Sequence, residues 1–457
     1  MTAKQLQKKH PKFIYEKFSY SLGKSGLACK FRFKLEPNIF FRPEILIKGV
    51  GKKETKNLPA EVLENFVFHI GLAEIPSYWK CAGSQKIEIK AARINEEQIK
   101  WWEGLLLNGL AEFFYKNGIN PKNGLFKIVS TGRNTLRKET KSKGADSGLL
   151  VPVGGGKDSL VALKLIQATH NKIGTMVLGN VKASYNLIKS LELKPPIKIE
   201  RKIDKKLLAL NKKGYLNGHT PFSAYLAFLS IFCARLFGYG TIVAGNERSA
   251  NEPNISFGGK KINHQYSKSY EFEKNFRAYA KKYLTENVSH FSILRPLYEL
   301  QIAKLAAKYS KSLAVTRSCN VNMKKNSWCG KCPKCLSVYI LLYPFLGAEK
   351  TKKMFGKDLF GDKNLWKYIP GLIGDKTEKP FDCVATRKEN MAALDLAVKK
   401  SEKKMPYVLK KFRKSRGGKT TSTKEIEKIL LSWDNKNFLP TNIKKILKNT
   451  ITTFSHS

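Results

Sequence analysis

The chain has 457 residues, 42% of them hydrophobic and 26% charged, which is typical of a globular protein of two or three domains. Its formal net charge is +48, but only 14 of the 84 basic residues are Arg, the side chain preferred for forked contacts with phosphates and bases. The charge therefore favours an anionic small substrate over nucleic acid. The longest uncharged apolar run, residues 221–234, is too short to cross a bilayer.

Residues 1–146 predict an α+β unit without a recognisable catalytic motif. Residues 30–35 alternate apolar and charged side chains, as a half-buried strand does, and residues 95–98 predict a capping box that starts a helix. Residues 69–80 combine polar and aromatic groups around Pro76, which predicts either a helix end or a loop that contributes to a substrate pocket. The polar residues 138–146, with Gly144, mark the boundary of this unit.

A glycine-rich loop follows an apolar strand at residues 149–153 and opens a helix. Glycine backbone can bring N–H groups close to an anion, and the helix adds the positive end of its dipole, so we expect a phosphate cradle. A Walker A loop would need Ser or Thr at position 158, which is Asp. The predicted phosphate-binding residues are Gly154, Gly155, Gly156, Lys157, Asp158 and Ser159.

Strands and helices alternate from residue 147 to 346, which predicts an α/β unit with a parallel sheet covered on both faces. Candidate strands cover residues 175–178, 197–200 and 241–244, and we expect a last strand over 292–297. Ligands of such sheets bind beyond the carboxyl ends of the strands. Polar residues follow three predicted strands there, among them Asn180 and the segment 245–252, and the dense polar segment 263–271 comes soon after.

Four clustered cysteines predict a metal site and a reducing, cytoplasmic environment. Four thiolates close a tetrahedron around Zn²⁺, so the site is expected to be structural and to pin a loop beside the sheet. We prefer zinc to an iron–sulfur cluster because one ligand lies far upstream and an apolar helix follows at once, and a redox pair is the weakest option. The predicted ligands are Cys319, Cys329, Cys332 and Cys335, whereas Cys29, Cys81, Cys233 and Cys383 are expected to be small core residues.

Residues 347–457 predict a peripheral, helical and basic region. From residue 401 onward the sequence has 14 basic and 4 acidic residues. This composition is typical of a solvated helical tail or of an electrostatic contact with an acidic partner.

The glycine loop resembles the PP-loop of ATP pyrophosphatases, whose usual form is S-G-G-x-D-S, with Gly154 in place of the leading Ser. The glycine loop and the four clustered cysteines together resemble those of the 7-cyano-7-deazaguanine synthases. The chain more closely resembles the ATP-dependent UDP-N-acetylmuramoyl-L-alanyl-L-glutamate epimerases of bacterial peptidoglycan synthesis. The synthases have no counterpart of residues 69–80. The stretches that resemble the epimerases are 69–80, 152–159, 245–254, 264–273, 292–303, 317–345 and 379–384.

The resemblance implies a Rossmann-like PP-loop fold, ATP and Mg²⁺, AMP and pyrophosphate as products, and a role in cell wall biogenesis, cell shape and cell division. The implied reaction converts the terminal L-Glu of a UDP-linked muramoyl dipeptide to D-Glu. Adenylylation of the glutamyl carboxylate makes the Cα proton more acidic, and an acid and a base then invert the centre. The oligomeric state stays open.

On this hypothesis the glycine loop holds the ATP phosphates, with Asp158 near Mg²⁺ and Asn180 near the adenosine. Glu247 and His264 are candidate proton-transfer groups, and Lys268 is a further catalytic or anion-binding candidate. Arg248, Asn251 and Gln265 are candidate substrate ligands. Two alternatives remain: another adenylylating PP-loop enzyme, either synthase-like or tRNA-modifying, and a non-catalytic zinc-stabilised module that binds nucleic acid.

Overall fold

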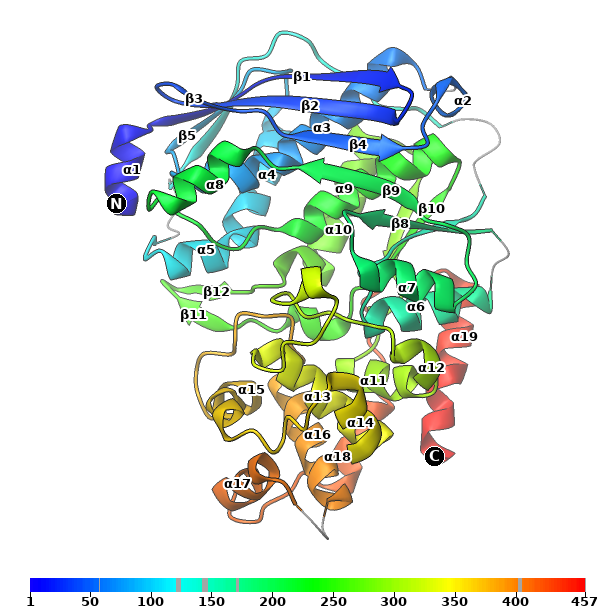
Figure 1. The fold of residues 1–457 in the computed structure, drawn as a ribbon. Coiled ribbons are helices and arrows are strands. Elements are labelled where there is room, and N and C mark those ends of the chain that lie inside the picture. Colours follow the sequence, from blue (N-terminus) through cyan, green and yellow to red (C-terminus); the bar gives the residue numbers. More distant parts are fainter. Residues whose placement is uncertain (57, 121–124, 142–146, 170–171, 402–404, 457) are drawn as a thin grey trace.

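The structure, a computed structural model, describes residues 1–457 except 57, 121–124, 142–146, 170–171, 402–404 and 457 (Figure 1). The predicted boundary residue Gly144 thus lies outside the described residues. The first part of the chain forms a mixed layer of strands with helices against one face. Its strands are β1 (Lys12–Gly23), β2 (Gly26–Leu35), β3 (Ile39–Phe41), β4 (Glu44–Lys48), β5 (Lys86–Ile89) and β6 (Lys127–Ser130). This layer is antiparallel from β4 to β1 and parallel from β1 to β6. Its helices are α1 (Ala3–Lys9), α2 (Lys52–Thr55), α3 (Ala60–Trp79), α4 (Glu96–Gly109) and α5 (Ala111–Lys116).

The central part alternates strands and helices, as the sequence predicts. Its sheet strands are β7 (Leu149–Pro152), β8 (Ile173–Leu178), β9 (Ile197–Lys202), β10 (Thr241–Ala244) and β13 (Ser289–Ser292), and β11 (Ile255–Phe257) and β12 (Lys260–Ile262) form a separate hairpin. The helices are α6 (Lys157–Gln167), α7 (Lys182–Ser190), α8 (Lys205–Lys212), α9 (Phe222–Phe237) and α10 (Tyr270–Tyr283). The last strand ends at Ser292, so the prediction of a strand over 292–297 is wrong in its bounds.

Both parts of the chain contribute to one sheet. Within the described residues its order is β13-β10-β7-β8-β9-β4-β2-β1-β5-β6, and β3 pairs with β2. Neighbours from β13 to β9 run parallel, which confirms the predicted parallel arrangement, and β9 then pairs antiparallel with β4. This pairing satisfies the backbone groups that β9 would otherwise expose at a sheet edge. The predicted units 1–146 and 147–346 are therefore joined through a continuous sheet.

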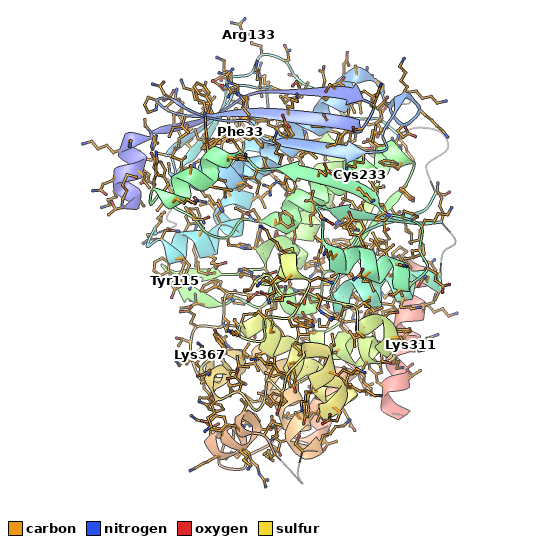
Figure 2. All side chains as sticks on the ribbon, viewed as in Figure 1. Phe33, Tyr115, Arg133, Cys233, Lys311 and Lys367 are labelled. Atoms are coloured by element: carbon orange, nitrogen blue, oxygen red, sulfur yellow. The ribbon has the colours of Figure 1, made fainter. Side chains whose placement is uncertain are left out.

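Helices α3 and α9 form much of the core that supports this sheet. Both are apolar on all sides, and Phe66 of α3 stacks on Phe232 of α9. Pro76 lies inside α3, so residues 69–80 are a buried helix that ends at Trp79 and not a pocket loop. Figure 2 shows side chains filling the space under the sheet, with Phe33 inside and Arg133 extending into solvent.

The last part of the chain is helical and gathers below the sheet (Figure 1). Its helices are α11 (Glu299–Ala307), α12 (Ser310–Leu313), α13 (Pro333–Leu346), α14 (Ala348–Phe355), α15 (Ile369–Ile373), α16 (Arg387–Lys400), α17 (Tyr407–Ser415), α18 (Thr423–Leu430) and α19 (Thr441–Thr452). Phe412, Ile429 and Leu447 are buried in the same core as α6 and α13. The prediction of a solvated tail is therefore wrong, because apolar residues at helical spacing pack inward while the lysines face water. No helix in the described ranges has both the length and the apolar character needed to cross a membrane.

Candidate functional site

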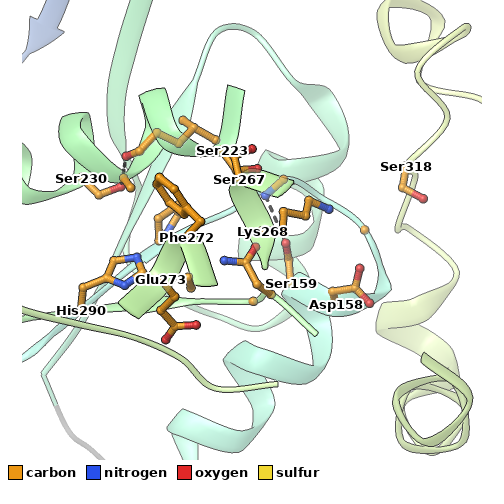
Figure 3. Close-up of a pocket in the computed structure, with 18 of the residues that line it drawn as sticks. Asp158, Ser159, Ser223, Ser230, Ser267, Lys268, Phe272, Glu273, His290 and Ser318 are labelled. Carbon is orange, nitrogen blue, oxygen red and sulfur yellow. Dashed lines mark hydrogen bonds between the residues drawn. The ribbon is translucent and has the colours of Figure 1, made fainter. Parts of the chain in front are cut away.

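The glycine loop joins β7 to α6 at the carboxyl edge of the parallel strands. Gly155 has a φ of +79°, and a Cβ added there would lie 2.7 Å from the backbone nitrogen of Ser184. The N–H of Gly154 donates to Oγ of Ser159 at 3.1 Å, which closes the loop onto the first turn of α6 (Figure 3). Only glycine combines this backbone conformation with such a close approach, so the loop requires Gly155.

A cavity of about 220 Å³ opens in front of this loop. Figure 3 shows Lys268 pointing toward the loop beside Ser159, with Ser318 on a separate segment across the cavity. Other lining residues come from the end of β10 and from helices α9 and α10. The lining includes Gly154, Gly156, Asp158, Ser159, Gly245, Asn246, Lys268, Ser318 and Lys334. Four predicted phosphate-site residues and a predicted catalytic lysine thus share one cavity with the end of a second strand.

Three carboxylates meet next to the loop. One oxygen each of Asp158, Glu247 and Glu299 lies within 4.8 Å of the others. Lys157, itself buried, pairs with Asp158 at 2.5 Å and with Glu299. Glu247 is 1% exposed, and neither of its oxygens has a hydrogen-bond partner among the described residues. A buried, unpartnered carboxylate is costly unless a cation binds it, so this cluster has the chemistry of a divalent-cation site.

Burial and the neighbouring carboxylates also raise the pKa of Glu299, the third member of this cluster. Burial raises the pKa of Glu299 to about 8, although Lys157 opposes the shift. The three carboxylates therefore repel one another unless a positive charge separates them.

A second cluster lies around Lys268, which lines the cavity. Its Nζ lies 3.6 Å from Sγ of Cys383, and His264 donates from Nδ1 to Oε2 of Glu112 at 2.5 Å. The ring of His219 lies 4.1 Å from the ring of His264, centroid to centroid. Burial and the neighbouring cations lower the pKa of His219 to about 3, so this second imidazole is neutral.

Charges around His264 and Cys383 stabilise an ion pair. Burial lowers the pKa of His264, but hydrogen bonds with Cys383 and Glu112 outweigh it and raise the value to about 9. Burial raises the pKa of the Cys383 thiol, but Lys268, Lys334 and His264 outweigh it and lower the value to about 6. The group is therefore a thiolate beside an imidazolium at neutral pH.

The four predicted metal ligands come together in one place. Their Sγ atoms all lie within 4.8 Å of one another, and those of Cys329 and Cys335 are 3.7 Å apart. A ZnS₄ tetrahedron with Zn–S bonds of about 2.3 Å has S···S edges of about 3.8 Å, so the donor set fits zinc. The segment before Cys319 reaches the glycine loop, because the N–H of Arg317 donates to the carbonyl of Gly155 at 2.8 Å.

A larger cavity, of about 770 Å³, lies between the 245–271 region and the C-terminal helices. Arg248 and Asn251 line it, together with Tyr298. The guanidinium of Arg248 lies 4.2 Å from the ring centroid of Tyr298 and donates to Oγ of Ser432 at 2.7 Å. Two predicted substrate ligands thus share a polar cavity that is distinct from the one at the glycine loop.

Two predicted site residues lie elsewhere. Asn180 follows β8, and Gln265 is buried; neither is among the described residues that line these two cavities. Cys29, Cys81 and Cys233 are fully buried, as predicted. Cys383 is half-buried and contacts Lys268, so its prediction as a core residue is wrong. Its neighbours in the sequence do not distinguish it from the buried Cys81, because its contact with Lys268 arises only in the folded chain.

Sequence reasoning also missed residues that reach the clusters from distant elements. Glu299 begins α11, Glu112 lies on α5, and Lys334 lies in the first turn of α13. None of the three occupies a ligand or catalytic position of a sequence motif, so the sequence alone does not mark them as site residues. Only the tertiary packing of these helices brings them to the site.

These features define a mixed α/β protein with a polar site at the carboxyl edge of its parallel strands. Family models described as the MurL N-terminal domain and the MurL C-terminal domain match residues 4–293 and 315–427. The chain belongs to the MurL family, and the relatives named below make it an isomerase-type enzyme. No solved structure matches it significantly.

Three similar proteins carry the name UDP-N-acetyl-alpha-D-muramoyl-L-alanyl-L-glutamate epimerase. The one from Xanthomonas oryzae pv. oryzae (strain MAFF 311018) is 31% identical over 74% of this chain and 75% of its own length. The one from Micromonospora sp. (strain ATCC 39149 / NRRL 15099 / SCC 1413) is 33% identical over 71% and 73%. The one from Salinispora tropica (strain ATCC BAA-916 / DSM 44818 / JCM 13857 / NBRC 105044 / CNB-440) is 33% identical over 70% of each chain.

Proposed function

We propose that this protein converts the terminal L-Glu of UDP-N-acetylmuramoyl-L-Ala-L-Glu to D-Glu during peptidoglycan precursor synthesis. Support comes from the names of the three relatives. The match to each relative covers between 70% and 74% of the chain. The substrate is a polyanion, which agrees with the net charge of +48 and with the lysines of the cavity.

We further propose that ATP activates the substrate and that residues 147–346 act as a PP-loop unit. Removing a proton next to a free carboxylate would give a doubly charged enolate. In the proposed step a carboxylate oxygen attacks the α-phosphorus of ATP, the bond to pyrophosphate breaks, and a mixed anhydride forms. The single observation that carries this proposal is the cradle at Gly154–Ser159, which opens into the same cavity as Lys268 and whose Asp158 belongs to the carboxylate cluster.

Asp158, Glu247 and Glu299 would hold a divalent cation beside the cradle. The unpartnered, buried carboxylate of Glu247 supports this role more than the proton-transfer role that the sequence suggests for it. When bound there, Mg²⁺ supplies positive charge to the phosphates. Lys157 neutralises part of the acidic cluster through its contacts with Asp158 and Glu299.

The larger cavity is the proposed site for the UDP-muramoyl part of the substrate. Arg248 presents a guanidinium stacked on Tyr298, and Lys260 and Lys436 also line this cavity. A guanidinium suits a diphosphate because its fork can donate two parallel hydrogen bonds. Asn251 lines the same cavity, whereas Gln265 would act only by supporting its neighbours.

The four cysteines are proposed to hold a structural zinc ion. The 3.7 Å separation of two Sγ atoms supports zinc, because a cubane cluster binds its thiolates on separate irons and hence farther apart. Through Arg317 the zinc-bound segment would fix the position of the glycine loop.

A single incubation tests the proposed function. The full-length protein is mixed with ATP, Mg²⁺ and UDP-N-acetylmuramoyl-L-Ala-L-Glu, and AMP, pyrophosphate and the chirality of glutamate after hydrolysis are measured. We expect D-Glu to form only when ATP is present, with AMP as the nucleotide product. D-Glu without ATP consumption would remove the adenylylation step, and AMP without D-Glu would indicate a different adenylylating enzyme.

A further inference from the structure

We propose that the thiolate of Cys383 is the base that removes the Cα proton of the activated glutamyl residue, and that Lys268 and His264 keep it charged. This inference rests on the proposed function. It assigns a catalytic role to a cysteine outside the metal cluster, and positioning roles to Lys268, His264 and Glu112.

The location of Cys383 carries the first step of the argument. Its Sγ lies 3.6 Å from Nζ of Lys268, and Lys268 lines the cavity with Ser159 and Asp158. Lys334, which also acts electrostatically on the thiol, lines the same cavity. Cys383 is half-buried, unlike the three fully buried cysteines of the core, and its contact with Lys268 places it next to the proposed reaction site.

A relay of polar groups from the N-terminal region orients the thiol. Glu112 accepts a hydrogen bond from Nδ1 of His264, and His264 is hydrogen-bonded to Cys383. A carboxylate, an imidazole and a thiol in this order form an activated thiolate, because the carboxylate fixes the tautomer and stabilises the imidazolium. Lys268 adds a second cation on the thiol.

The neighbouring groups are poorer proton acceptors. His264 is an imidazolium at neutral pH, and Lys268 is an ammonium whose pKa the surrounding anions raise in spite of its burial. Oδ1 of Asp382 already accepts the N–H of Cys383 at 3.1 Å. Asp158 is paired with Lys157. Among these groups the thiolate has an electron pair available for a proton, and it is only half-buried next to Lys268, which lines the cavity.

The step balances with water as the only other reactant. The Sγ electron pair takes the Cα proton, an S–H bond forms, and the C–H electrons pass into the enolate of the mixed anhydride. Water then delivers a proton to the opposite face of Cα, and the hydroxide that remains takes the proton of the thiol and restores the thiolate. A second water hydrolyses the mixed anhydride and releases AMP and the D-glutamyl product. One proton leaves and one is added, so the centre is inverted without change in redox state.

The test compares Cys383→Ser with Cys81→Ala, a conservative change at a buried core cysteine, in the full-length protein. Two activities are measured: substrate-dependent exchange of pyrophosphate into ATP, and deuterium incorporation at Cα together with D-Glu formation in D₂O. For Cys383→Ser we expect exchange to persist while deuterium incorporation and D-Glu formation fall by about 10²- to 10⁴-fold, the usual contribution of a general base. Cys81→Ala should retain both activities.

Several outcomes would overturn the assignment. Wild-type D-Glu formation by Cys383→Ser would do so, as would loss of exchange together with epimerisation, because that pattern indicates a binding role. A substrate thioester on Cys383, detected by mass spectrometry of the acid-quenched protein, would make the thiolate a nucleophile. If the wild-type protein shows no pyrophosphate exchange, the proposed function fails instead.

Alkylation of the wild-type protein gives a second measurement that does not depend on a variant. Iodoacetamide should label Cys383 faster at pH 7 than an unperturbed thiol, and ATP with substrate should protect it. Labelling of Cys383 no faster than that of a denatured control would also overturn the assignment.

Discussion

Oε2 of Glu112 lies 2.5 Å from Nδ1 of His264, although 152 positions separate the two residues. Glu112 comes from α5, and His264 comes from the segment between β12 and α10. The N-terminal region thus reaches the charged cluster at the carboxyl edge of the sheet. The carboxylate that it contributes is one of the groups that raise the pKa of the His264 imidazole against the effect of burial.

Replacing Glu112 with Gln is expected to lower the pKa of His264. Without the carboxylate the pKa of His264 falls, the imidazolium is lost near neutral pH, and the thiolate of Cys383 is less stabilised. We expect epimerisation to fall by about 10- to 100-fold, in line with the loss of a supporting partner, while pyrophosphate exchange persists. Glu378→Gln, at an exposed carboxylate, is the control. An unchanged pH profile in Glu112→Gln would contradict the relay.

The pH dependence of the wild-type enzyme follows from two shifted groups. The pKa of Cys383 is lowered to about 6, so the thiolate fraction rises as pH increases through that value. The pKa of His264 is raised to about 9, so its stabilising charge is lost above that value. The epimerisation rate should therefore rise near pH 6 and fall near pH 9, measured as kcat/KM for D-Glu formation. A rising limb near the ordinary thiol value would argue against a preformed thiolate.

Glu247→Gln separates catalysis from stability. The change removes a buried charge that has no protein partner, so the free energy of unfolding should stay constant or increase by about 1–3 kcal/mol. Pyrophosphate exchange should fall by at least about 100-fold and require more Mg²⁺, because a cation ligand is lost. Urea titration and exchange assays across a Mg²⁺ series measure the two effects, with the exposed Glu200→Gln as control. Destabilisation together with full exchange would contradict the cation role.

Gly155→Ala tests the cradle with a matched control at Gly179. Both glycines have a φ of +79°, but an added Cβ meets backbone only at Gly155 and finds open space at Gly179. The two variants share the conformational cost of about 1–3 kcal/mol, and only Gly155→Ala adds a clash with Ser184. We expect loss of exchange in Gly155→Ala alone. Equal activities in the two variants would show that the loop tolerates a side chain.

Metal analysis tests the cysteine cluster directly. We expect about one zinc and no iron per chain, and Cys329→Ser should lower both the zinc content and the melting temperature. Because Arg317 links this segment to Gly155, zinc loss should also raise the KM for ATP. Recovery of iron with acid-labile sulfide would identify a cluster instead.

Sequence alone determined the features that depend on neighbouring residues. The strand, glycines and helix of residues 149–163, the apolar helix α9, the parallel strand pattern and the cysteine ligand set all follow from local spacing. These predictions depend on backbone conformation and periodicity within a few turns. The prediction of a solvated tail at 401–457 is wrong because the high charge of this segment obscures apolar residues at helical spacing, such as Phe412 and Leu447.

Only the tertiary structure decided which distant groups meet. It joined the first sheet layer to the parallel strands through β9 and β4, and it brought Glu299 to Asp158 and Glu112 to His264. It also distinguishes Cys383 from the core cysteines, because the lowered pKa of its thiol depends on Lys268, which is more than a hundred residues away in the sequence. Charge interactions act through space, so the pKa of a thiol or carboxylate depends on packing that local sequence does not specify.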